Sequence, residues 1–440
     1  MIVADRERVL TEFLEREQER LARACHDMAR AFAKGGTLVP CGVGAAATDA
    51  AHVAVEFMHP VIVGKRALPA LALTNDPTGE SAPGRLLRPG DIALALAHGP
   101  VPDAVQEFLA AARSRGAMTI ALTGARAEAK ADYALAVPSD DAEIVQEVQE
   151  TTYHVLWELV HVFFEHPGLL QDSCITCGDV AVEARVVALH NGSALIEKDG
   201  AREEVAVELL EEVEVGDRVL CHAGVALERL GPGMPAEEDP TSFLYPFLDS
   251  REDDLESVLA DVRASTLHKR DDVVALRRAI DVEAIGRCAA DVRERLERGG
   301  RLISLGNGGS STDAQDVAGD CLARDWPAIA LTNDVATVTA VGNDVGFDKV
   351  FARQLIALAR AEDVALAIST SGSSPNVVAG LEEAHRRGML TVAITGYDGG
   401  RLAELDWLDH LFVVESDYIP RLQEAHATIY HLLLREVGER

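Results

Sequence analysis

Two stretches of the chain are versions of one pattern, GGTLVPCGVGAAATDA at residues 35–50 and GGRLISLGNGGSSTDA at residues 299–314. Three further agreements follow in the same order. PALALTND (69–76) pairs with PAIALTND (327–334), RSRGAMTIALTG (113–124) pairs with HRRGMLTVAITG (385–396), and each half then has a Gln and a His eight residues apart. Collinear matches of this kind indicate a duplicated domain.

Within each copy, short apolar runs alternate with longer helical patterns. LISLG (302–306) and VALAIST (364–370) are examples of the runs, and SPNVVAGLEEAHRRG (374–388) is an example of a helical pattern. This alternation is typical of βαβ units, and the absence of polar alternation indicates strands covered on both faces. We therefore predict an α/β fold in which each copy is a parallel-sheet sandwich. Ligands of such sheets bind outside the carboxyl ends of the strands.

The pattern changes between the copies. Residues 184–210, ARVVALHNGSALIEKDGAREEVAVELL, carry hairpin signals at Asn191-Gly192 and Asp199-Gly200 between β-branched runs, which predicts a small antiparallel β-barrel. GPGMPAEEDPTS, from Gly231, has the composition of a linker. The expected organisation is a first copy at 1–170, a barrel at 172–232, a linker at 233–250 and a second copy at 251–440.

Composition limits the class of protein. A chain of 440 residues suits two or three domains, and 41 Lys and Arg against 72 Asp and Glu give a net charge of −31. Such a charge disfavours nucleic acid and anionic membrane as main partners. The first residues, MIVADRERVLTEFLEREQERL, form a charged amphipathic pattern, and no later run reaches the roughly 18 apolar residues of a membrane span. With seven scattered cysteines, we expect a cytoplasmic protein with reduced thiols.

Two loops of the second copy have the composition of an anion site. GNGGSS (306–311) follows a predicted strand and opens a helix, so its backbone N–H groups can hold an anion. STSGSSPN (369–376) also lies between a strand and a helix and adds hydroxyl donors. Helix capping by Ser and Thr is the alternative explanation for the second loop.

With these loops, further segments of the second copy resemble the phosphoheptose isomerase branch of the SIS (sugar isomerase) family. The resemblance rests on GNGGSSTDAQ, LTNDVATVTAVGNDVGFDKVF, STSGSSPNVVAGLEEAHRRG, TVAITGYDGG and PRLQEAHATIYHLL, in order, over nearly all of the 140 residues after Gly300. It implies that a sugar phosphate is bound by Asn307, Ser310, Asp344, Ser369, Thr370, Ser371, Ser374 and Gln423.

The resemblance also implies aldose–ketose interconversion through an enediol, which needs an acid/base pair and often a divalent metal such as zinc. The family's set is a His and a Glu four apart on the helix after the first loop, with a Gln and a His eight apart on the last helix. The second copy keeps Gln423 and His431 but has Asp316 and Asp320 in the first two places. If Asp320 acts with His431, its carboxylate reaches about 1 Å less far than Glu, and such misplacement can cost about 10²-fold in rate. Asp316 and Asp320 could still hold a hard metal.

The first copy has the complementary set. It carries all four family residues for metal binding or acid/base catalysis, with Glu56 and His154 as the catalytic pair: His52, Glu56, Gln146 and His154. Its phosphate loops are gone, because CGVGAAATD (41–49) and Ala97–Pro102 stand in their places, and the segment that matches GNDVGFDKVF is shortened. Two interpretations stay open: the copies form a pseudo-dimer that shares one composite site, or the first copy has become purely structural.

The middle segment resembles the HypC/HupF family of hydrogenase-maturation chaperones, through CITCGDVAVEARVVAL (174–189) and VGDRVLCHAGVALERL (215–230). The resemblance implies that Cys174 and His222 hold an iron fragment with cyanide and carbonyl ligands for a nickel-iron hydrogenase. Cys174 lies inside the chain and lacks the family's following Pro, and Cys177 makes a C-x-x-C that could bind zinc or form a redox pair. An inert barrel is the alternative.

Two functions follow from these resemblances. One is isomerisation of a ketose phosphate similar to sedoheptulose 7-phosphate. The other is a non-catalytic maturation or scaffold protein for nickel-iron hydrogenase assembly, whose SIS domains only bind a ligand or dimerise. Asp316 and Asp320 weaken the first function, while the phosphate loops support sugar-phosphate binding. In either case we expect a homo-oligomer.

Overall fold

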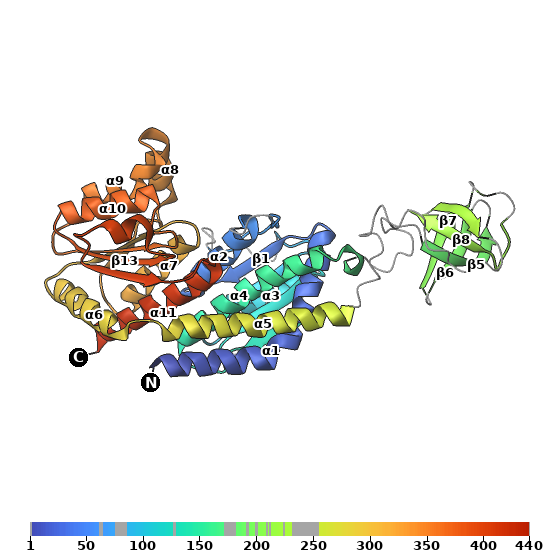
Figure 1. The fold of residues 1–440 in the computed structure, drawn as a ribbon, viewed down its shortest axis with the longest axis horizontal. Coiled ribbons are helices and arrows are strands. Elements are labelled where there is room, and N and C mark those ends of the chain that lie inside the picture. Colours follow the sequence, from blue (N-terminus) through green and yellow to red (C-terminus); the bar gives the residue numbers. More distant parts are fainter. Residues whose placement is uncertain are drawn as a thin grey trace. The chain divides into compact units, whose positions relative to one another are not determined.

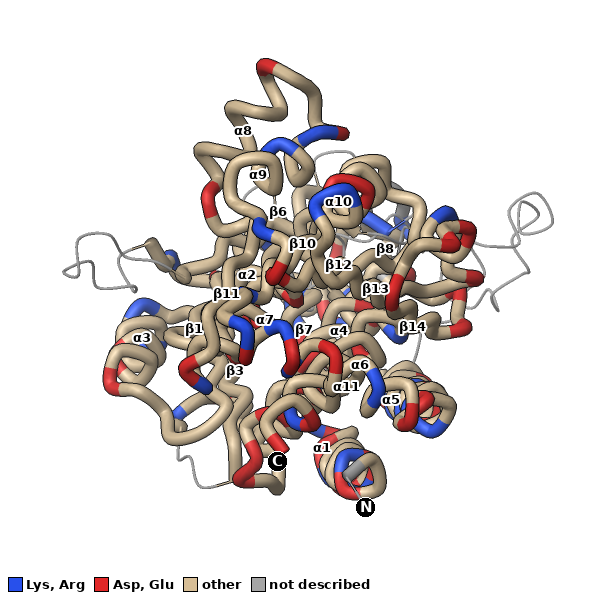
Figure 2. The backbone as a smooth tube through the Cα atoms, turned by 90° about the vertical axis from the view of Figure 1, so that its left-hand side faces the viewer, with Lys and Arg blue, Asp and Glu red and all other residues tan. Residues whose placement is uncertain are grey.

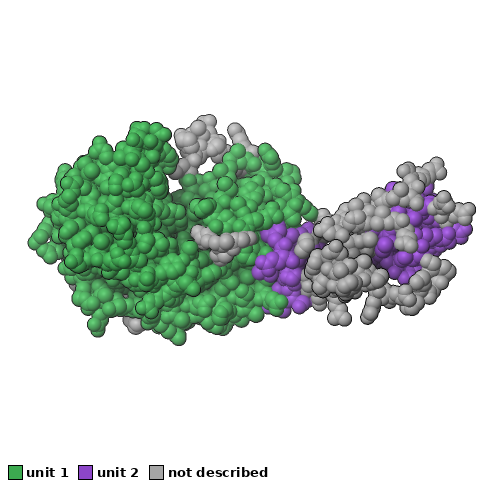
Figure 3. Space-filling view, turned by 45° about the horizontal axis from the view of Figure 1, so that its top comes forward, with its two compact units in different colours: residues 1–161, 261–440 green, residues 162–260 purple. Residues whose placement is uncertain are grey.

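The computed structural model describes two compact units. The described residues are 2–60, 65–74, 86–125, 129–170, 182–190, 193–198, 201–207, 210, 213–222, 225–230 and 255–439. One unit combines residues 1–161 with residues 261–440, and the other comprises residues 162–260 (Figure 3). The two predicted SIS copies therefore form a single compact unit. The predicted linker at 233–250 lies outside the described residues.

The first copy is a four-stranded parallel sheet with helices (Figure 1). Its elements are α1 (Ile2–Ala33), β1 (Leu38–Gly42), α2 (Ala46–Met58), β2 (Ile92–Leu96), α3 (Asp103–Ser114), β3 (Met118–Thr123), β4 (Tyr133–Ala136) and α4 (Ala142–Phe164). The strand order is β1-β2-β3-β4, with Leu38 opposite Ile92 and Ile92 opposite Met118. The described residues of PALALTND, 69–74, pair with β1 through isolated bridges at Ala70 and Leu73.

The second copy has a five-stranded parallel sheet in the order β11-β10-β12-β13-β14. Its elements are α5 (Leu255–Arg278), α6 (Val282–Glu297), β10 (Leu302–Gly306), α7 (Gly309–Ala323), β11 (Ala328–Ala330), α8 (Val335–Asp344), α9 (Val350–Leu358), β12 (Val364–Ser369), α10 (Pro375–Arg386), β13 (Leu390–Gly396), β14 (His410–Val414) and α11 (Ile419–Gly438). Apolar residues of α6 and α11 pack in one core, and those of α9 and α10 pack in another. Strands covered on both faces confirm the predicted α/β architecture.

Long helices join the two copies. Acidic and basic residues both occur on α1 and α5 (Figure 2), and Arg270 of α5 contacts Glu15 of α1 at 2.7 Å. Between α4 and α11, Thr428 donates a hydrogen bond to Glu147 at 2.8 Å. Helix α2 of the first copy packs on α7 of the second copy. The sites of the two copies therefore meet at one interface inside the unit.

The other unit contains β5 (Val182–His190), β6 (Ser193–Lys198), β7 (Ala201–Ala206), β8 (Arg218–His222) and β9 (Val225–Leu230). The pairs β5–β6, β6–β7, β5–β8 and β8–β9 are antiparallel, as predicted. The link between β7 and β9 is one parallel bridge, Ala206 to Val225, so the sheet is not antiparallel throughout. The predicted turns at 191–192 and 199–200 lie outside the described residues. Within the described ranges, none of the helices is long and apolar enough to cross a membrane.

Candidate functional site

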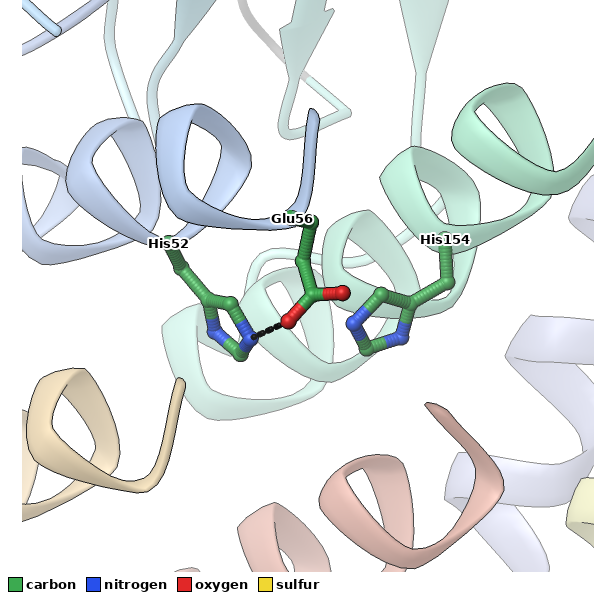
Figure 4. Close-up of side chains that lie close together, drawn as sticks. All are labelled: His52, Glu56 and His154. Atoms are coloured by element: carbon green, nitrogen blue, oxygen red, sulfur yellow. Dashed lines mark ion pairs between the residues drawn. The ribbon is translucent and has the colours of Figure 1, made fainter. Parts of the chain in front are cut away.

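Three side chains predicted from the first copy converge in a buried centre. His52 and Glu56 lie one turn apart on α2, and His154 approaches from α4 (Figure 4). Nε2 of His52 is 3.6 Å from a carboxylate oxygen of Glu56. One ligand atom from each of the three residues lies within 4.8 Å of the others. The arrangement can therefore hold one metal ion or a proton-transfer pair.

The glutamine that contacts this centre comes from the second copy. Nε2 of Gln423, on α11, lies 2.9 Å from Nε2 of His52. The sequence grouped Gln146 with His154 because both are on α4, but eight residues span about 12 Å of helix. Gln146 is also buried, but it lies nearer than His154 to the N-terminal end of α4. The centre is thus composed of residues from both copies, which the order of motifs along the chain does not reveal.

The donor atoms of this centre fit a metal ion such as zinc. Three buried polar atoms have no hydrogen-bond partner among the described residues: Oε2 of Glu56, Nε2 of His154 and Oε1 of Gln423. The Glu424 carboxylate accepts a hydrogen bond from Nδ1 of His154 at 2.9 Å, which directs the Nε2 lone pair of His154 away from Glu424. A carboxylate behind an imidazole is the usual support of a metal-bound His. Nitrogen and oxygen donors in this combination suit zinc.

Electrostatics give the three side chains different protonation. Burial opposes the charged form of His52, but the Glu56 carboxylate and the charge of Asp313 outweigh it and raise the pKa of His52. Burial works against ionisation of Glu56 too, yet His52 lowers the pKa of this carboxylate below its ordinary value. Burial lowers the pKa of His154, although Glu424 opposes the shift. A neutral His154 therefore stands beside an ionised Glu56.

The first phosphate loop of the second copy packs directly on this centre. Gly309 begins α7, and a Cβ at this position would collide with Nε2 of Gln423 and would lie 2.6 Å from Nε2 of His52. Only glycine leaves room for both side chains. The corresponding residue of the first copy is Ala45. The GNGGSS loop of the second copy thus adjoins residues of the first copy that the sequence predicts to be acid/base residues.

The second loop lies beside the first. Asn307 and Asn376 exchange side-chain hydrogen bonds of 2.9 and 2.8 Å, which tie the GNGGSS loop to the start of α10. The other predicted sugar-phosphate residues near these two strand ends are Ser310, Ser369, Thr370, Ser371 and Ser374. Asp344 is exposed at the end of α8, where it accepts a hydrogen bond from Asn343. Asn376 was not predicted, although its place one residue into a helix after a hydroxyl-rich loop was the available signal.

The second copy has a matching centre around Asp316, Asp320 and His431, and its residues have changed. Nδ1 of His431 is 2.9 Å from Glu147, as His154 is from Glu424, and Nε2 of His431 is 3.8 Å from Asp320. Asp316, however, accepts a hydrogen bond from Thr48. In place of the second loop, His98 pairs with Asp49 at 2.7 Å. This centre lacks both the His–Glu pair and the phosphate loops.

The predicted iron ligands are not placed by the structure. Cys174 and Cys177 lie outside the described residues, and only the backbone of His222 is described, at the end of β8. The iron-binding prediction therefore stays a prediction.

Comparison with known proteins identifies the family. The SIS domain family matches residues 3–124 and 270–396, which is more than half of the chain. The chain belongs to the SIS domain family. Its SIS sequence is 44% identical over 161 residues to a phosphoheptose isomerase from Solidesulfovibrio magneticus, covering 35% of this chain and 78% of the relative. A phosphoheptose isomerase from Aquifex aeolicus is 42% identical over 157 residues, covering 34% of this chain and 81% of the relative.

The other comparisons concern the fold and the middle segment of this SIS protein. The C-terminal domain of glucosamine-fructose-6-phosphate aminotransferase from Francisella tularensis aligns with a TM-score of 0.51 at 8% identity, over 99% of this chain and 93% of that chain. At this identity the likeness concerns the fold alone. Residues 180–238 match the HupF/HypC family, which supports the resemblance found in the sequence.

Proposed function

We propose that this SIS protein is an aldose–ketose isomerase for a ketose phosphate similar to sedoheptulose 7-phosphate, with one composite site that both copies build. The observation that carries the proposal is the packing of Gly309 against His52 and Gln423. Through this contact, the phosphate loops retained by the second copy adjoin the acid/base residues retained by the first. The relatives named phosphoheptose isomerase support the substrate class.

The two loops would hold the phosphate. The backbone N–H groups at the start of α7 can donate hydrogen bonds to an anion, and the positive end of the helix dipole favours its charge. Ser369, Thr370 and Ser371 add hydroxyl donors from the end of β12. A phosphate held there would place the sugar carbons toward His52 and Gln423, because Gly309 of the loop packs directly against these two side chains.

The acid/base pair would then transfer a proton between adjacent sugar carbons. The ionised Glu56 can accept the proton from the carbon next to the carbonyl, which gives an enediolate that becomes the enediol when its oxygen is protonated, and Glu56 can return the proton to the neighbouring carbon. His154 lies across the centre from another helix and can exchange a proton with the sugar oxygens (Figure 4). A metal held by His52, Glu56, His154 and Gln423 would polarise the carbonyl oxygen.

Turnover of sedoheptulose 7-phosphate by three variants tests this function. Glu56→Gln removes the base of the first copy and should lower kcat by about 10²-fold or more. Ser371→Ala removes a phosphate donor of the second copy and should lower kcat/KM by roughly tenfold, the value of one hydrogen bond to a charged group. Ser114→Ala, on the exposed face of α3, is the control. Phosphate-loop dependence without Glu56 dependence would contradict the composite site.

We also propose a second function, in hydrogenase maturation, because residues 180–238 match the HupF/HypC family. In this proposal the five strands close into a barrel, and Cys174 with His222 holds the iron fragment for maturation partners. Protein produced together with the maturation machinery should contain iron that is lost in Cys174→Ser and His222→Ala. Iron content unchanged in both variants would contradict this role. We further expect the protein to be cytoplasmic and to form a homo-oligomer. Light scattering tests the oligomeric state.

A further inference from the structure

Four carboxylates are buried together where α2 and α7 of the two copies meet near α4. Asp49, Glu150, Asp313 and Asp316 are between 1% and 9% exposed. Burial raises the pKa of Asp313 to about 7, and burial together with the charge of Asp313 raises the pKa of Glu150 well above its usual range. Carboxylates placed this close without water or cations are costly to ionise.

Two of the four carboxylates already have partners. Asp49 pairs with His98 at 2.7 Å, and Asp316 accepts a hydrogen bond from Thr48. In contrast, Oε1 of Glu150 and Oδ2 of Asp313 are buried without a hydrogen-bond partner among the described residues. One ligand atom each from Glu150, Asp313 and His52 lies within 4.8 Å of the others.

We propose that Glu150 and Asp313 hold a hard divalent cation of the Mg²⁺ or Mn²⁺ class next to His52, separate from the metal that the composite centre would bind. Carboxylate oxygens are the preferred ligands of these ions, which keep water in their remaining positions. The position of Glu150 corresponds to Ala427 in the second copy, so the duplicated structure offers this ligand on one side only. The cation would offset the buried negative charge beside His52.

The competing explanation is a proton shared by Glu150 and Asp313. Both explanations account for two carboxylates that each have one oxygen without a partner among the described residues, but only a cation site takes up an ion. If the two carboxylates share a proton, replacing Glu150 would leave metal binding unchanged and would raise the free energy of unfolding. Metal binding by the intact chain therefore separates the two.

The test is a Mn²⁺ titration of the full-length protein, stripped with EDTA and loaded with one equivalent of Zn²⁺, followed by electron paramagnetic resonance. The wild type should bind one Mn²⁺ per chain, and Glu150→Gln and Asp313→Asn should each weaken this binding at least tenfold. Glu12→Gln, at an exposed position on α1, is the matched control and should bind as the wild type does. A further variant, Glu150→Ala, introduces the residue type that the second copy has at the matching position, Ala427.

Two results would overturn the proposal: no Mn²⁺ bound by the wild type, or equal Mn²⁺ binding by the wild type and both carboxylate variants. Glu56→Gln separates this proposal from the isomerase proposal, since it should lose Zn²⁺ while retaining Mn²⁺. Loss of isomerase activity alone therefore has no bearing on the second cation.

Discussion

Gly309 is the residue of the second copy that packs directly against His52 of the first copy. It lacks the Cβ that would collide with Gln423 and crowd His52, whereas the first copy has Ala45 at the matching position. At this position the two centres differ by a single methyl group, in addition to the replacement of the His–Glu pair by Asp316 and Asp320 in the counterpart.

Adding this methyl group should disable the centre while leaving the fold intact. In Gly309→Ala, Gln423 and His52 must move, and we expect kcat to fall by about 10²-fold, the cost of misplacement by about 1 Å. The colliding atoms are the ends of side chains, so the melting temperature should change little. Ala45→Gly makes the reverse change at the matching position and should leave kcat unaltered. Equal activity of Gly309→Ala and wild type, measured as turnover of sedoheptulose 7-phosphate, would show that the loop does not adjoin the site.

At this scale the sequence predicts the types of residue better than their grouping. His52, Glu56 and His154 were predicted from the match of the first copy to the residue set that the family resemblance implies, and the structure brings them together. Gln423 was assigned to the other copy's set, because spacing along a helix carries no information about which copy a side chain faces. Glu150 belonged to no motif, and only its burial without a partner distinguishes it.

Helix α4 connects three other helices through one buried carboxylate. Glu147 accepts hydrogen bonds from Arg6 of α1 at 2.8 Å and from Thr428 of α11 at 2.8 Å, and Arg277 of α5 lies 3.2 Å away. Burial opposes ionisation of Glu147, but the charges of Arg6 and Arg277 outweigh it and lower the pKa of this carboxyl below its ordinary value. The contacts hold α4 and α11 in the positions that the composite centre needs.

Glu147→Gln should destabilise the unit by about 3 kcal/mol at neutral pH, because it leaves buried arginines without their partner. A carboxylate with a lowered folded pKa contributes stability above its ordinary value of about 4.3 and loses it as the pH falls through the folded value. The two free energies of unfolding, measured by urea denaturation, should therefore converge in acid. Glu12→Gln, at an exposed ion pair with Arg8 on the same helix, should cost less than about 1 kcal/mol. If Glu147→Gln lowered the free energy of unfolding by as little as this control, Glu147 would not be the residue that holds these helices together.

Most elements were predictable, and one difference between the copies is informative. PAIALTND forms β11 in the second copy, whereas the described residues of PALALTND, 69–74, contact β1 through isolated bridges at Ala70 and Leu73 and through backbone hydrogen bonds such as that from Leu71 to Leu38. Nearly identical residues therefore pair less regularly in the described part of the first copy than in the second, since pairing at a sheet edge depends on the surrounding packing. Central strands such as β10 and β12, which are paired and covered on both sides, followed their apolar runs closely.

In the whole molecule, each copy keeps the group of predicted site residues that the other copy has lost. The first copy keeps His52, Glu56 and His154 without phosphate loops, and the second keeps the loops with Asp316 and Asp320 instead of His and Glu. Because one compact unit contains both copies, one site can stay complete while the other loses its function. The sequence could show the losses but could not choose between a composite site and a structural first copy.

The middle module should be dispensable for isomerisation. Its strands belong to the unit of residues 162–260, and every residue of the composite centre belongs to the other unit. Replacing residues 172–254 by a Gly/Ser linker of equal length should therefore leave kcat/KM within roughly twofold, as for independent sites. A large loss in the same assay, with the melting temperature of the remaining unit unchanged, would show that the module takes part in the reaction.

The central claim is that a single composite site, with its base in the first copy, performs the reaction. The most direct measurement is kcat with sedoheptulose 7-phosphate for Glu56→Gln and for Asp320→Asn, which make the same kind of change at matching positions. The composite site predicts a loss of about 10²-fold or more in Glu56→Gln and a value within roughly twofold of wild type in Asp320→Asn. A large loss in Asp320→Asn with activity retained in Glu56→Gln would contradict it.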